Sequence, residues 1–94
     1  MEFDAGDFAT LQQHYERLWA LYTEFEQSRS TEIVKAMQST CRSARRVTNP
    51  RYRYAIEQLG WIEGALRPKP TGHDLYAIHQ AIMRLENAVT RLKP

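Results

Sequence analysis

The chain has 94 residues, one cysteine and a formal net charge of +2, and 43% of its residues are hydrophobic against 26% charged. This length makes one domain that hides roughly 60% of the surface of its unfolded chain, so folding requires neither a metal nor a disulfide. The composition argues against disorder, and neither a signal peptide nor an apolar run of membrane length is recognisable. We therefore expect a single cytoplasmic domain over residues 1–94.

Charge is segregated along the chain. Residues 1–32 carry seven acidic and two basic residues, a net −5, whereas residues 33–56 carry six basic residues and no acid, a net +6. The remaining residues have a net charge of +1. The middle of the chain is therefore the natural place to look for a surface that binds negative charge.

Two helices are predicted in the first half of the chain, over about residues 5–27 and 31–47. Their apolar residues recur at steps of three and four, which aligns them on one face of a helix. These residues are Phe8, Leu11, Tyr15, Leu18, Tyr22 and Phe25 in the first, and Ile33, Val34, Met37, Cys41 and Ala44 in the second. Asp4 is placed to cap the first helix, and Ser30 or Thr31 to cap the second.

Two more helices are predicted over about residues 50–66 and 72–92. Asn49-Pro50 marks a boundary, because proline suits the first helical position and asparagine is a good cap, so we expect the third helix to begin at Pro50. Arg67-Pro68-Lys69-Pro70 ends it, and Thr71 with Asp74 forms a capping pair for the fourth. The apolar positions of the fourth helix are Leu75, Ile78, Ile82, Leu85, Val89 and Leu92.

The connections between these helices are three to six residues long, which makes consecutive helices antiparallel. The sequence therefore predicts an all-α fold, a compact antiparallel bundle of four helices. In such a bundle the start of the first helix, the end of the second, the start of the third and the end of the fourth share one end.

Five arginines lie within twelve positions at that end: Arg42, Arg45, Arg46, Arg51 and Arg53. Pairing with the nearby acids Glu2, Asp4 and Asp7 would leave basic charge in excess. Arg51 and Arg53 fall in the first turn of the expected third helix, where a positive side chain opposes the helix dipole. Three interpretations remain open: a solvated or internally paired surface, a clamp for carboxylates of a partner, or a phosphate site in which Tyr52 and Tyr54 stack on bases.

The third helix carries a second apolar face. Tyr54, Trp61 and Ala65 lie nearly opposite the stripe that faces the core, and Gly60 and Gly64 lie between the two faces. Glycine inside a helix costs about 1 kcal/mol relative to alanine, so two of them suggest close approach by another backbone. The alternative is ordinary core packing with tolerated glycines.

Residues for catalysis or metal binding are not grouped in any recognised motif. His14, His73 and His79 lack metal-ligand spacing, and Cys41 lies on an apolar stripe where cysteine usually acts as a small buried hydrophobe. We therefore expect no enzyme activity, no cofactor, no bound metal and no small-molecule substrate.

Residues 48–66, TNPRYRYAIEQLGWIEGAL, resemble a segment of small helical proteins encoded among bacteriophage head and tail assembly genes. The shared features are an Asn-Pro, an aromatic residue, and a helix with small residues before a closing leucine. The resemblance implies a non-catalytic accessory or virion component, present in many copies and found in the host cytoplasm or the virion.

The leading hypothesis from the sequence is a protein-protein interaction module that self-associates or docks on a larger assembly. The contact would use Tyr54, Trp61, Gly60, Gly64 and the arginines at positions 42, 45, 46, 51 and 53. The alternatives are a nucleic-acid-binding protein that uses the same arginines, and a small inhibitor of a host or partner protein.

Overall fold

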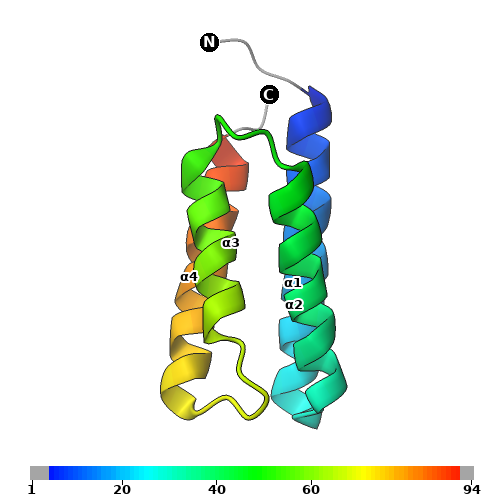
Figure 1. Cartoon of the computed structure of the whole chain (residues 1–94), viewed down its shortest axis with the longest axis vertical. Coiled ribbons are helices and arrows are strands. Elements are labelled where there is room, and N and C mark those ends of the chain that lie inside the picture. Colours follow the sequence, from blue (N-terminus) through cyan, green and yellow to red (C-terminus); the bar gives the residue numbers. More distant parts are fainter. Residues whose placement is uncertain (1–4, 92–94) are drawn as a thin grey trace.

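The computed structural model describes residues 5–91, which form four helices joined by short connections (Figure 1). These are α1 (Ala5–Ser28), α2 (Thr31–Val47), α3 (Arg53–Ala65) and α4 (Gly72–Arg91), and residues 5–91 include no strand. The predicted all-α bundle is therefore confirmed. The predicted cap at Asp4, the acid Glu2 and the expected last turn at Leu92 lie outside the described residues.

The helices form two antiparallel pairs, α1 with α2 and α3 with α4, which stand side by side (Figure 1). Each helix packs against two neighbours, because α2 also contacts α3 and α1 also contacts α4. The bundle measures 41 × 19 × 19 Å. As the sequence predicted, the start of α1, the end of α2, the start of α3 and the end of α4 lie at one end of the molecule.

Each helix places one apolar stripe on the common axis of the bundle. Leu18, Met37, Leu59 and Ile82, one from each helix, are all completely buried. The free energy gained by burying such side chains is the main term that holds the helices together. Trp19 is 38% exposed, whereas its neighbour Leu21 is buried.

Polar contacts tie neighbouring helices together around this core. The Tyr15 hydroxyl of α1 donates to Glu86 Oε2 of α4 at 2.5 Å. Burial and this hydrogen bond raise the pKa of Tyr15 to about 12. Between α3 and α4, Arg84 Nε donates to Gln58 Oε1 at 2.7 Å.

The connection between α2 and α3 differs from its prediction. Asn49 does not cap a helix that begins at Pro50: its side-chain oxygen accepts from the Arg51 amide at 3.1 Å, and its carbonyl accepts from the Tyr52 amide at 3.0 Å. These bonds close a turn, a role to which asparagine is equally suited. The helix therefore begins only at Arg53, with Tyr52 at the N-cap, and it ends at Ala65.

The capping residues of α2 and α4 confirm their predictions. The Ser30 side chain accepts from the Glu32 amide at 3.2 Å. Before α4, the Thr71 amide donates to Asp74 Oδ2 at 2.9 Å, and the Asp74 amide donates to Thr71 Oγ1 at 3.1 Å. The backbone hydrogen bond from Thr71 is the main cause that lowers the pKa of Asp74.

Removal of the Thr71 cap should destabilise the fold. We expect Thr71→Ala to lower the free energy of unfolding by about 1 kcal/mol, the usual loss for a helix N-cap. Thr23→Ala is the control, because the Thr23 hydroxyl bonds only to the Trp19 carbonyl of its own helix. Denaturant unfolding of Thr71→Ala and Thr23→Ala measures the difference between them, and equal midpoints would contradict the capping role.

The same cap depends on pH. Because the pKa of Asp74 is lowered, its stabilising charge is present at neutral pH and is lost as the pH falls through that lowered pKa.

Candidate functional site

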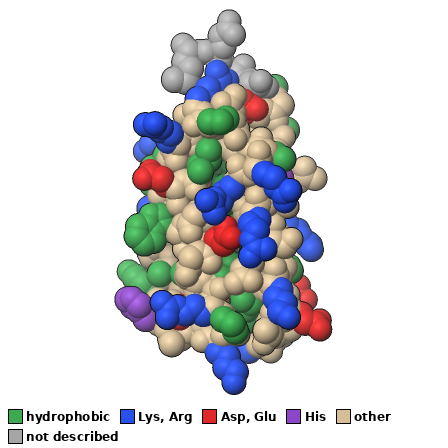
Figure 2. Space-filling view, viewed as in Figure 1, with side chains coloured by type: hydrophobic (Ala, Val, Ile, Leu, Met, Phe, Trp, Pro, Cys, Tyr) green, Lys and Arg blue, Asp and Glu red, His purple; other side chains and the backbone are tan. Residues whose placement is uncertain are grey.

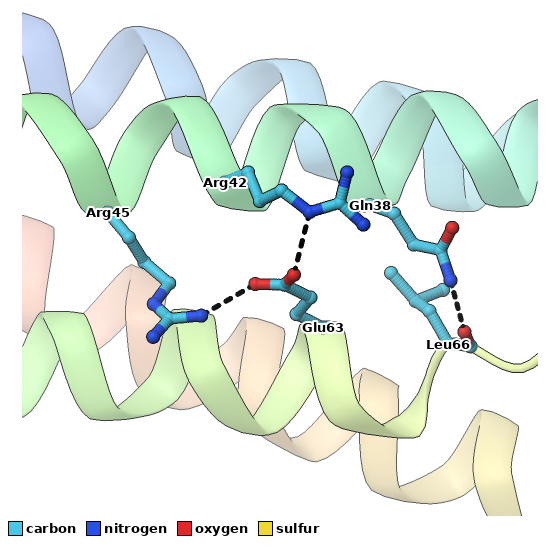
Figure 3. Close-up of polar contacts among 5 residues, drawn as sticks. All are labelled: Gln38, Arg42, Arg45, Glu63 and Leu66. Carbon is cyan, nitrogen blue, oxygen red and sulfur yellow. Dashed lines mark hydrogen bonds and ion pairs between the residues drawn. The ribbon is translucent and has the colours of Figure 1, made fainter.

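Two of the five predicted arginines share one carboxylate on α3 (Figure 3). Arg42 Nε lies 3.1 Å from Glu63 Oε2, and Arg45 Nη1 lies 2.7 Å from Glu63 Oε1. A further contact between the same helices, in which Gln38 Nε2 donates to the Leu66 carbonyl at 2.6 Å, lies next to this cluster. The acid that pairs with Arg42 and Arg45 is thus Glu63, which the sequence analysis did not single out, rather than the acids at the start of α1.

The other three arginines lie nearer the end of the bundle. Arg51 Nη2 is 3.7 Å from Asp7 Oδ2, which agrees with the predicted approach of an acid from α1. Arg51 lies in the turn before α3, so the expected conflict with the helix dipole applies only to Arg53. Arg46 and Arg53 are exposed and form no ion pair with another residue of the range 5–91.

The surface formed by α2 and α3 is accordingly basic but not uniformly so. Figure 2 shows Lys and Arg side chains spread along this face, with acidic side chains among them near its middle. Hydrophobic side chains appear at the left edge of the same view, where α3 and α4 lie, and also among the basic side chains toward the top of this face. Basic and apolar side chains are therefore interspersed on the surface of α3.

An open groove of about 870 Å³ runs between α3 and α4. Trp61 of α3 and Tyr76 of α4 line it, and their side chains are 68% and 65% exposed. Gly60 and Gly64 also line this groove, so Trp61 and the two glycines share one surface in the structure. Tyr76, which lies off the apolar stripe of α4, completes the aromatic lining of the groove.

Neither Gly60 nor Gly64 is required by packing within the chain. A Cβ atom built on either residue meets no atom within 4 Å apart from its own helix and chain neighbours. The close approach of another backbone, which the sequence suggested, is therefore not made by any other described segment of this chain. The space above both glycines is open to a partner.

A second, smaller hollow of about 250 Å³ lies at the arginine-rich end of the bundle, also between α3 and α4. Tyr54, which is 44% exposed, lines it together with Arg51, Arg53 and Arg91. The structure therefore divides the predicted binding residues among three places. Tyr54 lies with Arg51 and Arg53, Trp61 with the two glycines, and Arg42 with Arg45 on the α2 side of α3.

Cys41 and His79, whose side chains are of chemically reactive types, both pack against other side chains of the bundle. Cys41 is buried, and burial raises the pKa of its thiol to about 12, so the reactive thiolate is scarce at neutral pH. The His79 ring lies 6.0 Å from the Trp19 ring and 5.8 Å from the Tyr22 ring. Within residues 5–91, no three His, Cys, Asp or Glu side chains are grouped as a metal site would require.

No family model matches this chain, and no curated protein or solved structure is significantly similar to it. The resemblance to small phage proteins therefore stays a prediction. Among the described residues, no helix combines the length and apolar character that crossing a membrane demands.

The open space above the glycines leads to a test of their role. We expect Gly60→Ala and Gly64→Ala each to raise the free energy of unfolding of the isolated chain by up to about 1 kcal/mol, because alanine favours the helix and meets no obstacle. Thermal unfolding in dilute solution measures the change. A loss of stability in both variants would show that the glycines serve the fold itself.

The shared carboxylate gives a second test. We expect Glu63→Gln to lower the free energy of unfolding by less than about 1 kcal/mol, because both arginine side chains are largely exposed. Met37→Ala, a change in the core, should cost about 2–5 kcal/mol in the same assay. Urea unfolding at low and high salt provides the measurement, and high salt should remove the difference between Glu63→Gln and the natural chain. A loss as large as that of Met37→Ala would mean that this cluster is structurally essential.

Proposed function

We propose that this chain is a non-catalytic protein-interaction module that docks through the groove between α3 and α4. Its partner is another copy of itself or a component of a larger assembly. The observation that carries the proposal is Trp61, whose indole is 68% exposed beside two glycines with open space above them. Tyr76, on the opposite side of the groove, is 65% exposed.

Exposed aromatic residues beside a hollow are typical of protein contacts. Tryptophan, tyrosine and arginine are the residue types that most often dominate binding energy at such contacts, where they fill a well-packed centre. A helix of the partner that lies over Gly60 and Gly64 would approach the α3 backbone closely, while Trp61 and Tyr76 cover its sides. Close approach by a partner would then add binding free energy that offsets the helix stability lost by having glycine instead of alanine at these positions.

Arginines gather in the second, separate hollow between α3 and α4. Arg51, Arg53 and Arg91 line the hollow at the end of the bundle, and no acid among residues 5–91 lines it with them, although Arg51 pairs with Asp7 nearby. Carboxylates of a protein partner fit this charge, and ion pairs of this kind guide the orientation of a complex more than they add affinity.

Nucleic-acid binding is the second candidate, because Arg46 and Arg53 are exposed without an ion pair among residues 5–91 and Tyr54 is available for stacking. Glu63 pairs with both Arg42 and Arg45, so it reduces the positive charge that these two arginines would offer to phosphates. Binding to phosphate would weaken steeply as salt rises, whereas an aromatic contact would not. The contrast separates the two candidates.

The groove suits either a component of a multi-copy assembly or a target protein that the chain inhibits. The resemblance of residues 48–66 to phage head and tail proteins favours a multi-copy assembly in a bacterial cytoplasm or a virion. A small inhibitor would use the same groove to cover the surface of its target.

Photo-crosslinking in the cells that produce the chain tests the proposed function. We expect a benzoylphenylalanine introduced at Gln80, which lines the groove, to form a protein adduct of defined mass. The same group introduced at Gln13, an exposed glutamine of α1, should form none. Trp61→Glu should abolish the Gln80 adduct, since a buried charge at the centre of a contact is unfavourable.

Two results would contradict the proposed function. The first is the same adducts from both positions, and the second is a Gln80 adduct that persists in Trp61→Glu. An adduct with nucleic acid that depends on Arg46 and Arg53 would favour the second candidate.

A further inference from the structure

We propose that the occupant of the α3/α4 groove is a second copy of this chain, packed about a two-fold axis with the two α3 helices antiparallel. This inference rests on the proposed function and names the partner. Three properties of the groove carry it: where the glycines lie, where the aromatic side chains lie, and the order of charges along it.

The glycines lie in the second half of α3, one on each side of Ile62. Gly60 and Gly64 each lie two residues from Ile62 in the chain. An axis that crosses α3 at the level of Ile62 therefore sets Gly60 of one copy opposite Gly64 of the other. Because both Cβ positions are open, the two helices can approach at the short distance that small residues permit.

The aromatic side chains suit the same arrangement. Trp61 lies one residue from the axis level, so each indole would lie over the glycines and groove of the other copy. Tyr76 faces the same groove from α4. Both side chains, each about two-thirds exposed in one copy, would be covered without any change in the fold.

Charge decides between the antiparallel and the parallel arrangement. Glu57 lies in the first half of α3, and Arg67 lies in the connection just after the end of α3, so the antiparallel arrangement brings Glu57 of each copy near Arg67 of the other. Glu57 is exposed and forms no ion pair within residues 5–91. Arg67 Nε lies 3.8 Å from Asp74 Oδ1 of its own chain, but the Arg67 side chain is 71% exposed and can also meet a carboxylate of a second copy. The antiparallel arrangement therefore adds two symmetric ion pairs at the rim of the contact.

A parallel arrangement would bring like charges together. Arg51, Arg53 and Arg91 line the separate hollow at the arginine-rich end of the bundle, and a parallel pair would set these three arginines close to the same three of the other copy. Antiparallel copies hold the two arginine-rich ends at opposite ends of the dimer. These charges therefore favour the antiparallel orientation, in which the same surface of both copies meets about a two-fold axis.

Light scattering over a range of concentrations tests whether the chain forms this dimer. We expect the natural chain to shift from monomer to dimer as concentration rises, and Trp61→Glu to remain a monomer. Val47→Glu is the matched control, because Val47 is a 55% exposed hydrophobic residue of α2 away from the groove. Circular dichroism confirms that each variant is folded.

Charge reversal tests the antiparallel orientation. Glu57→Arg and Arg67→Glu should each weaken self-association by about tenfold, since either change replaces two attractive rim contacts by two repulsive ones. An equimolar mixture of the two variants should regain the dimer, because both contacts in the mixed pair join opposite charges. Their double variant should also associate as the natural chain does.

The outcomes separate the two proposals. If the chain stays monomeric at every concentration and the Gln80 crosslinker captures a different protein, the proposal that a second copy occupies the groove is wrong. The proposed function as a protein-interaction module is then still supported. A chain that stays monomeric and yields no Gln80 adduct overturns both. Dimers that depend on Trp61 but ignore both charge reversals, or a mixture that fails to associate, overturn the antiparallel arrangement.

Discussion

The structure depends on one constraint: each helix can give only one stripe of its surface to a core shared by four helices. Leu18, Met37, Leu59 and Ile82 fill that core from four directions, and their burial leaves no room on the axis for a second face of any helix. α3 carries apolar residues on two faces, so one of them must lie at the surface. The exposed indole of Trp61 is the direct result of this geometry rather than a local accident.

The helices were predictable because their apolar residues repeat with the helical period, and three of the four began at the expected residue. The start of α3 was not, because Asn49-Pro50 fits two local structures with similar hydrogen bonds. Asparagine can cap a helix or close a turn, and only the path that carries the chain from α2 across to α3 selects the turn. Sequence spacing holds no information about that path.

The candidate site was predictable where it lies on one helix and unpredictable where two helices meet. The helical wheel identified Trp61, Gly60 and Gly64 as residues of α3 away from the core stripe, but it grouped Trp61 with Tyr54, which lines a separate hollow. Their association with Tyr76, and that of Arg42 and Arg45 with Glu63, depends on how each helix is rotated about its own axis in the bundle. That rotation is set by the packing of all four helices together. The arginines therefore separated into groups that no sequence interval indicated.

The enclosed position of Cys41 has a practical consequence. Its sulfur is buried among apolar side chains at the centre of the bundle, and its thiol keeps its proton at neutral pH. Maleimides, thiol-specific nitroxides and similar reagents need an accessible thiolate, so we expect Cys41 not to react with them while the bundle is folded. A single cysteine engineered on any outer surface can then carry a fluorophore or spin label selectively. Site-specific labelling of this protein therefore does not require substitution of Cys41.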